Sequence, residues 1–543
     1  MNKFELLDWV VLGGYFAVLF GVAIWVILQR KKDTEDYFLA GRNVGWFVVG
    51  ASIFASNIGS EHMVGLAGQG FENGMPMAHY ELHAWIVLLL GWVFLPFYAR
   101  SGVFTMPEFL ERRYGARARW FLSIFSLVGY VLTKVSVTIF AGGMVIAALF
   151  EIEFWTGALL TVLLTGVYTV LGGMRAVVYT EAFQTVVLIL GATLTLFLGL
   201  QEVGGWTELK ATVGSEHFNM WRPMSDPDFP WTGLVFGGAI VGIWYWCTDQ
   251  YIVQRTLAAK NITIGRRGAI FGAFLKLLPV FIFMVPGIIA YAMVIQGKMT
   301  IDDADQALPA LMMALLPAGL KGLVAGGLLA ALMSSLASVF NSCSTLFTID
   351  VYQKLRPERE ESHYFRVGQI ATIIVVILGV IWIPVMERIS GTLYEYLQSV
   401  QSYIAPPITA VFLLGIFSKR ITERAAMATL WSGVGIGAAR LILELFKGSL
   451  TEGSLIYQFA DMNFMHFAIF MFVICVAILV IVSFTDKTAL TSTERDKKLE
   501  GLTFQTITAE QRAAEKNNYA LIDVVVSVVL VVVIIGILLY FRG

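Results

Sequence analysis

The chain is dominated by apolar runs of about 20 residues, the length that an α-helix needs to cross the hydrocarbon core of a bilayer. Fourteen such runs are present, beginning near residues 9, 44, 77, 120, 156, 177, 231, 268, 321, 366, 392, 425, 464 and 520. Of the 543 residues, 57% are hydrophobic and 14% are charged, and the mean hydropathy is +0.73, unlike a soluble protein. The sequence therefore predicts an all-α integral membrane protein of about 14 transmembrane helices.

Lysine and arginine are distributed unevenly between alternate loops. The set of loops that runs from 29–43 to 485–519 holds 27 of the 38 basic residues, whereas the other set, which includes both termini, holds 8. The positive-inside rule places the basic set in the cytoplasm. We therefore expect a multi-pass protein of the plasma or inner membrane, with both termini extracellular or periplasmic.

Two of the apolar runs turn polar near their centres. The second, 44–70, contains SNIGSEHMVGLAG at 56–68, and the seventh turns polar at Cys-Thr-Asp-Gln, 247–250. Lipid tolerates neither unpaired backbone groups nor bare charge at that depth. Because the two runs are five spans apart, they cross the membrane in opposite directions, as in an inverted repeat whose broken helices meet at the midplane. This pattern favours a solute and ion site at the breaks over the alternative of two kinked helices whose polar residues pair with their neighbours.

Glu81 lies inside the third span and Lys276 lies near the middle of the eighth. Glu81 and Lys276 could form a structural salt bridge, or could line a polar cavity that offers an acceptor and a donor to a neutral polyol, whose hydroxyls need both. Tyr245 and Trp246 present flat faces suited to the C–H surface of a pyranose, although aromatic residues of membrane helices usually serve packing. Two further polar residues are candidates for lining the same cavity: His62 and Gln398.

One face of the ninth span is made of small residues and hydroxyls. At helical spacing, Ala331, Ser334, Ser335 and Ser338 share this face, which could serve close helix packing or ion binding. If it opposes the break at 55–58, hydroxyl and carbonyl oxygens would converge without a carboxylate. Such a cage suits a monovalent cation such as sodium better than calcium.

Other charged positions are expected to be structural. Lys134 is expected to snorkel toward the membrane surface. Asp249 and Arg255, close together in sequence, are expected to pair with each other. The net charge of −1 and the pI near 6.6 argue against nucleic acid as a partner, and the three cysteines have no metal-binding spacing. Nothing in the sequence predicts the oligomeric state.

Seven stretches, in order along residues 35–420, resemble the sodium:solute symporter family, specifically its sodium/glucose cotransporter branch. They are EDYFLAGR (35–42), ASNIGSEHMVGLAG (55–68), TMPEFLERRYG (105–115), GGMRAVVYTEAFQT (172–185), WYWCTDQYIVQRTLAAK (244–260), SSLASVFNS (334–342) and QSYIAPPITAVFLLGIF (401–417). The resemblance implies a leucine-transporter-like core of two inverted five-helix repeats and alternating access driven by a sodium gradient. It implies a transporter rather than an enzyme.

The resemblance also implies site residues, position by position. The implied sugar site is Asn57, His62, Glu81, Tyr245, Trp246, Lys276 and Gln398. The implied outer hydrophobic gate is Leu66, Tyr80 and Tyr394, while Tyr245 closes the inner side. The implied sodium site uses backbone oxygens of Ala55, Ile58 and Ala331 and the hydroxyls of Ser334 and Ser335.

Three positions depart from the family pattern. Ala337 replaces a threonine of members that bind a second sodium, so we expect one sodium per sugar. Glu181 replaces an aspartate and could alter ion access or proton use. Gly242 replaces a polar residue of characterised sugar carriers, so the identity of the substrate stays open. The GSEH sequence at 59–62 is also similar to that of myo-inositol carriers.

The sequence thus predicts a hexose symporter in five parts. These are an extra N-terminal helix at 1–34, a first repeat at 35–200 with its broken helix at 44–70, an extracellular loop at 201–230, a second repeat at 231–420 with its broken helix at 231–252, and peripheral helices at 421–543 with a cytoplasmic loop at 485–519. The expected partners are sodium, a neutral sugar such as glucose or galactose, and the lipid bilayer. The alternatives are a sodium/myo-inositol symporter and a sugar sensor without net uptake.

Overall fold

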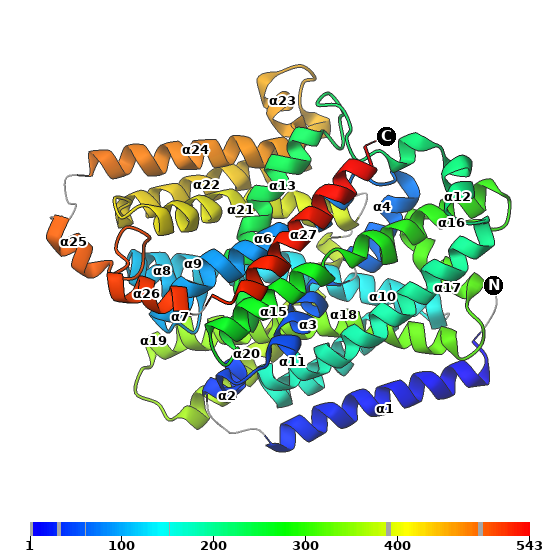
Figure 1. The fold of residues 1–543 in the computed structure, drawn as a ribbon, viewed down its shortest axis with the longest axis horizontal. Helices are drawn as coiled ribbons and strands as arrows, with labels where there is room; N and C mark the ends of the chain where they lie inside the picture. The colour runs from blue at the N-terminus through cyan, green and yellow to red at the C-terminus, as the bar shows by residue number, and fades with distance from the viewer. Residues whose placement is uncertain are drawn as a thin grey trace.

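The computed structural model describes residues 4–29, 34–59, 61–150, 152–386, 393–486, 492–517 and 519–542, and these are almost entirely helical. Figure 1 shows the helices lying side by side as a bundle, with α1 along one edge and α21, α22 and α24 stacked along the opposite edge. The longer helices are α1 (Leu6–Gln29), α3 (Trp46–Asn57), α9 (Ala116–Tyr130), α10 (Ser136–Phe150), α11 (Phe154–Val203), α15 (Ile262–Leu275), α16 (Val285–Ile295), α18 (Leu320–Thr345), α20 (Glu361–Met386), α21 (Leu393–Phe417), α22 (Glu423–Leu445), α24 (Phe464–Thr485) and α27 (Leu521–Tyr540).

Shorter helices connect or continue the long ones. They are α2 (Thr34–Leu39), α4 (Ala67–Glu72), α5 (Ala78–Leu82), α6 (Ala84–Leu89), α7 (Leu95–Ser101), α8 (Met106–Arg113), α12 (Trp206–Val213), α13 (Gly238–Ile243), α14 (Gln250–Leu257), α17 (Ala307–Leu315), α19 (Gln353–Leu355), α23 (Leu455–Asp461), α25 (Ser492–Lys498) and α26 (Ala509–Asn517). Two π-helical turns matter below: η2 (Glu61–Leu66) and η7 (Trp244–Thr248).

Eleven helical stretches within the described residues are long and apolar enough to cross a membrane. They are Leu6–Gln29, Ala78–Ser101, Ala116–Ala147, Gly173–Val203, Ile262–Ile295, Leu320–Leu355, Glu361–Pro384, Leu397–Phe417, Glu423–Leu445, Phe464–Thr485 and Leu521–Tyr540. Three shorter apolar helices, Trp46–Asn57, Phe154–Val167 and Gly233–Thr248, fall where the sequence predicts the remaining spans. The predicted total of fourteen crossings stays a prediction, because the three short helices are not long enough to span by themselves.

The long α11 covers two predicted spans. Gly173 interrupts its helical backbone with φ of 60° and ψ of −159°, at the predicted boundary between the fifth and sixth spans. A Cβ at Gly173 would meet the ring of Tyr37 at 2.4 Å, so both the backbone conformation and the packing require glycine here.

Both predicted breaks are present. α3 ends at Asn57, Ile58 is extended with ψ of 94°, and the helix resumes at η2 and continues as α4. In the other break, η7 ends at Thr248, Asp249 is extended with ψ of 128°, and α14 begins with the Asp249 carboxylate accepting the Tyr251 N–H. The polar residues therefore mark helix ends, as the sequence predicts.

Helices differ in how deeply the bundle encloses them. In the most apolar 18-residue window of each span, 94% of residues are buried for the stretch that contains α18, against 22% for α27 and 28% for α1. The exposed side chains of α1, α24 and α27 are large aliphatic and aromatic groups, as a lipid-facing surface requires. α18 thus lies at the core of the bundle, and α1, α24 and α27 lie at the periphery of the bundle.

The two chain ends lie toward the same end of the bundle, away from α25 and α26 (Figure 1). Near the N-terminus, Asp8 accepts the Gly319 N–H at 2.7 Å, and at the other terminus Phe541 accepts the Met220 N–H at 2.9 Å. Both contacts join a terminus to a loop of the predicted outer set. At the opposite end, Lys419 pairs with Asp496 at 2.7 Å, which joins two loops of the predicted inner set.

Candidate functional site

Glu81 lies at the centre of a buried polar cluster. Its Oε2 accepts the Lys276 Nζ at 3.0 Å, and its Oε1 lies 3.1 Å from the Nε2 of His62. His62 Nε2 is in turn 3.2 Å from the Nδ2 of Asn57. All four side chains are buried. The break in the second span brings the last residue of α3, Asn57, next to a residue of the first turn of η2, His62, and the ends of α5 and α15 supply the charged pair.

The two alternatives for Glu81 and Lys276 turn out to be compatible. The pair forms a salt bridge, and the same two residues line a cavity. The cavity wall is formed by Asn57, His62, Tyr80, Glu81, His83, Val241, Gly242, Tyr245, Trp246, Lys276, Leu397, Gln398 and Gln401. All seven sugar-site residues named from the sequence are in this wall. The cavity measures about 50 Å³, far less than the 300 Å³ or more of most ligand pockets, so a bound pyranose requires it to widen.

Two polar wall residues, His83 and Gln401, were missed by the sequence reasoning. His83 follows Glu81 by two residues, and Gln401 lies one helical turn after Gln398 on α21. Gln401 could have been found from its spacing, because residues i and i+3 share a helix face. His83 could not, because its position depends on how the segment at 78–89 packs against α13.

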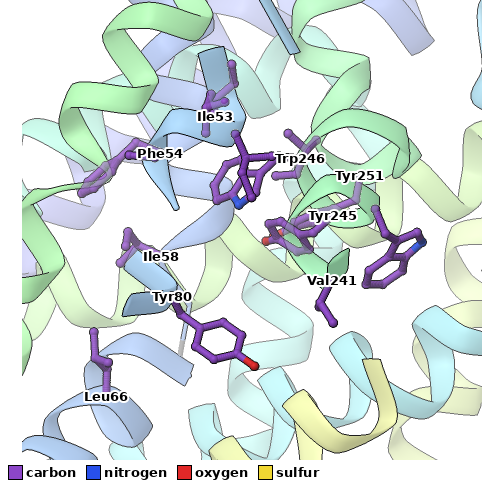
Figure 2. Packing of buried hydrophobic residues seen from close by; sticks show 14 of the residues in the cluster. Ile53, Phe54, Ile58, Leu66, Tyr80, Val241, Tyr245, Trp246 and Tyr251 are labelled. Carbon is purple, nitrogen blue, oxygen red and sulfur yellow. The ribbon is translucent and has the colours of Figure 1, made fainter. Parts of the chain in front are cut away.

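Aromatic residues contribute to the cavity wall. Tyr245 and Trp246, in η7, have ring centroids 5.0 Å apart, and Lys276 Nζ lies 4.8 Å from the centroid of the Trp246 ring. Figure 2 shows Tyr245 and Trp246 together and Tyr80 apart from them, and all three residues line the cavity. Lys134 Nζ lies 4.1 Å from the Tyr245 ring and 4.1 Å from that of Tyr251.

The expectation that Lys134 snorkels to the surface is therefore wrong. Its side chain is buried, and the faces of the two tyrosine rings supply negative potential that stabilises the ammonium group in place of water.

The structure describes the side chains of two of the three residues expected to form the outer gate. Tyr80 lines the cavity, and Leu66, at the end of η2, is fully buried (Figure 2). Tyr394 belongs to α21, but its side chain lies outside the described residues.

A second cluster joins α18 to the same break. The Ser334 hydroxyl donates to the Ala55 carbonyl at 2.9 Å and lies 3.1 Å from the Ala331 carbonyl. The Ser335 hydroxyl lies 3.2 Å from the Ser56 carbonyl and 3.3 Å from the Ile58 carbonyl. Because α3 stops here, its last carbonyls have no partner in a following helical turn and face the hydroxyls instead. The structure thus brings together all five residues named for a cation, with neutral oxygens only.

Comparison with known proteins agrees with this geometry. The sequence profile described as the sodium:solute symporter family matches residues 37–433. The chain belongs to the sodium:solute symporter family. Human sodium/glucose cotransporter 4 is 40% identical over 508 residues, which cover 86% of this chain and 74% of the relative. Human sodium/myo-inositol cotransporter 2 is 40% identical over 471 residues, which cover 80% of this chain and 70% of the relative.

Solved structures confirm the fold of this symporter. An outward-open, substrate-bound Na⁺-coupled sialic acid symporter aligns with a TM-score of 0.75 at 23% identity, covering 89% of this chain and 99% of the other. Mhp1, a nucleobase-cation-symport-1 transporter in a closed conformation, aligns with a TM-score of 0.51 at 13% identity, covering 85% of this chain and 98% of the other. The predicted all-α membrane architecture with a leucine-transporter-like core is therefore confirmed. The match to the family and to its curated members shows that the chain is a transporter rather than an enzyme.

The carboxylate of Glu181 lies beside the hydroxyl cluster of the symporter. Ser56 Oγ donates to it at 3.1 Å, Arg255 Nη2 pairs with it at 3.4 Å, and the hydroxyls of Ser52 and Ser338 also donate to it. The expected pairing of Arg255 with Asp249 is therefore wrong.

Asp249 instead accepts the hydroxyl of Tyr130. Arg255 lies six residues, or about 1.7 helical turns, beyond Asp249 on α14, so the two side chains leave the helix on different faces. The Arg255 side chain contacts Ser56 of α3 and Glu181 of α11 instead.

Packing accounts for two of the departures in the symporter's sequence. A Cβ at Gly242 would meet Ile86 Cδ1 at 2.6 Å, so a side chain at this position would have to displace Ile86. Ala337 is fully buried in an apolar cluster with Ala23, Val177 and Met333.

Proposed function

We propose that the protein is a sodium-coupled symporter that imports a hexose, glucose or galactose, by alternating access, with one sodium per sugar. The observation that carries the proposal is that one helix break serves two clusters. One is a donor and acceptor set with an aromatic wall, suited to a sugar. The other is a cage of neutral oxygens, suited to a monovalent cation.

The break itself provides the coupling. Asn57, which faces the cavity, lies directly between the residues whose carbonyls meet Ser334 and Ser335. An ion bound by those oxygens fixes the end of α3 against α18 and so fixes the position of Asn57. By linkage, the sugar then stabilises the ion-bound state to the same degree.

Binding requires existing contacts to be exchanged. The hydroxyls of Ser334 and Ser335 now donate to carbonyls, so they must rotate to present lone pairs to sodium. Sugar hydroxyls must likewise compete for Glu81, His62 and Lys276, which are paired with one another here. Widening of the cavity and loosening of these pairs belong to the same conformational step.

Ala337 supports a stoichiometry of one sodium per sugar. Where members with a second sodium offer a threonine hydroxyl, this chain presents a methyl group packed in an apolar cluster.

We propose that the repeats run over 35–200 and 231–420. We also propose that the protein lies in the plasma or inner membrane, with the basic loops in the cytoplasm and both termini outside.

A myo-inositol carrier is the second candidate, because two observations favour it. The human sodium/myo-inositol cotransporter is as similar in sequence as the human glucose cotransporter, at 40% identity each. In addition, Gly242 presents no side chain to the cavity, at a position that is polar in characterised sugar carriers.

Uptake into proteoliposomes tests the proposal. Labelled galactose, glucose and myo-inositol are each supplied with an inward sodium gradient, or with potassium in place of sodium. Sodium-dependent accumulation of a hexose supports the proposal, and accumulation of myo-inositol alone assigns the second candidate. Sodium-driven current without accumulation of any of the three identifies a sensor and contradicts import.

A further inference from the structure

A cavity of about 550 Å³ opens at the end of the bundle opposite the chain termini. It lies between the α8–α9 corner, the loop that joins α21 to α22, the end of α24, and α25. Figure 1 shows α8, α9, α25 and α26 gathered at this end. It contains none of the residues of the proposed sugar and sodium sites.

The wall of this cavity is strongly basic. Two acidic residues, Glu423 and Asp486, are outnumbered by six basic ones: Arg113, Arg117, Lys419, Arg424, Arg495 and Lys498. Burial lowers the pKa of Arg113, and the nearby positive charge of Arg495 adds to that effect. Lys419 is paired with Asp496, which lies outside the wall, and the five other basic residues still outnumber the two carboxylates.

Much of this charge has no protein counterpart. Arg113 donates to the backbone carbonyls of Gly415, Ser418 and Ile421, which leave its charge uncompensated. Within the described parts of the chain, no ion pair joins Arg117, Arg424 or Lys498 to a carboxylate. These three side chains are exposed, so they are available to an anion.

The basic cavity adjoins a second cavity whose lining mixes apolar and polar residues. A second cavity of about 410 Å³ shares Ile421, Asp486 and Arg495 with the first. It extends along α21 and α24 past Leu414, Val480 and Phe484, and the Phe484 side chain is 70% exposed on a helix of the lipid-facing periphery. A basic hollow that opens onto a lipid-facing groove matches the shape of a phospholipid, with its charged head and apolar tails.

We infer that this pair of cavities binds an anionic phospholipid, with its phosphate among Arg117, Arg424 and Lys498 and its acyl chains along α21 and α24. Basic pockets between transmembrane helices on the cytoplasmic side are suited to anionic headgroups. The lipid bridges α9, α22 and α25 and so holds the segment at 492–498 against the bundle. A free phosphate compound would use only the basic cavity.

The test uses the full-length protein purified in detergent. Dioctanoyl phosphatidylglycerol, dioctanoyl phosphatidylcholine and glycerol 3-phosphate are titrated separately, and binding is followed by native mass spectrometry and by the shift in thermal unfolding. The test variant is Arg117→Gln/Arg424→Gln/Lys498→Gln. The matched control, Lys260→Gln/Arg356→Gln/Lys497→Gln, removes the same charge from exposed positions outside both cavities.

The expected result is saturable binding and thermal stabilisation by phosphatidylglycerol alone. The affinity of the test variant for phosphatidylglycerol should fall by about one order of magnitude or more, because three headgroup contacts are lost. The affinity of the control variant should change less than about twofold. Equal binding of phosphatidylcholine overturns the inference, as does equal loss in both variants. Equal protection by glycerol 3-phosphate also overturns it, by assigning the basic cavity to a soluble phosphate compound.

Discussion

The two clusters at the break of the second span hold their polar groups in different ways. Around Glu81, ionic groups compensate one another: the carboxylate pairs with Lys276 and contacts His62. The direct partners of the Ser334 and Ser335 hydroxyls are neutral carbonyls, and the Glu181–Arg255 ion pair lies beside them. Removing one member of a buried ion pair leaves a bare charge, whereas removing a hydroxyl leaves at most one unsatisfied carbonyl. The first cluster therefore depends on all of its members, and the second tolerates loss in steps.

The largest effect is expected for Glu81→Ala. It leaves Lys276 buried without its partner, which typically costs about 3–5 kcal/mol, and it also removes an acceptor for the sugar. We expect sugar binding to fall about 100-fold or more, with a lower unfolding temperature. Binding is measured by isothermal calorimetry at saturating sodium.

The double variant Glu81→Ala/Lys276→Met separates the two roles of Glu81. It removes both charges, so thermal stability should return most of the way while sugar binding stays absent. Recovery of both would make the pair structural only and would remove it from the sugar site.

A smaller effect is expected for Gln398→Ala. Gln398 lines the cavity from α21, and losing one hydrogen bond to a neutral sugar hydroxyl is worth about 0.5–1.5 kcal/mol, or up to about tenfold in affinity. Thermal stability and the sodium concentration for half-maximal uptake should stay the same. A change in sodium dependence larger than that in sugar affinity would place Gln398 outside the sugar site.

A still smaller and opposite pattern is expected for Ser335→Ala. The change removes one cage oxygen, so the sodium concentration for half-maximal uptake should rise about fivefold, with sugar affinity at saturating sodium unchanged. Ser344→Ala is the matched control, because Ser344 is a buried serine of the same helix whose hydroxyl donates to the Gly368 carbonyl at 2.8 Å. Equal sodium dependence in both variants would show that the cage is wrong.

The sequence predicts features of a single helix better than contacts between helices. The break after Asn57 is predictable because polar residues inside an apolar run mark a helix end. The shared face of Ser334 and Ser335 follows from helical spacing. The partner of Arg255 and the burial of Lys134 depend on which helices pack side by side, and that information is absent from the period of any one segment.

Figure 2 sharpens this point at the gate. Tyr80 and Tyr245 are far apart in sequence, yet both side chains border the same cavity. The resemblance to a known family places Tyr80 in the outer gate and Tyr245 in the sugar site, and the sequence itself does not bring the two residues together. The Gly242 departure shows the same limit, because the sequence marks an unusual residue but not that Ile86 fills the space beside it.

The smallest effect is expected for Tyr80→Phe, which tests where the sugar pocket ends and the gate begins. If Tyr80 closes the outer side through its apolar ring, phenylalanine keeps that contact, and its hydroxyl, which has no hydrogen-bond partner among the described residues, is not missed. Sugar affinity should change less than about threefold, and stability should be equal or slightly higher, because a buried hydroxyl without a partner costs free energy. Tyr80→Ala is the contrasting variant: it removes the ring and should weaken sugar binding more than Tyr80→Phe does. A tenfold loss in Tyr80→Phe itself, measured by the same calorimetry, would assign the hydroxyl to the sugar and extend the ionic and polar cluster outward into the gate.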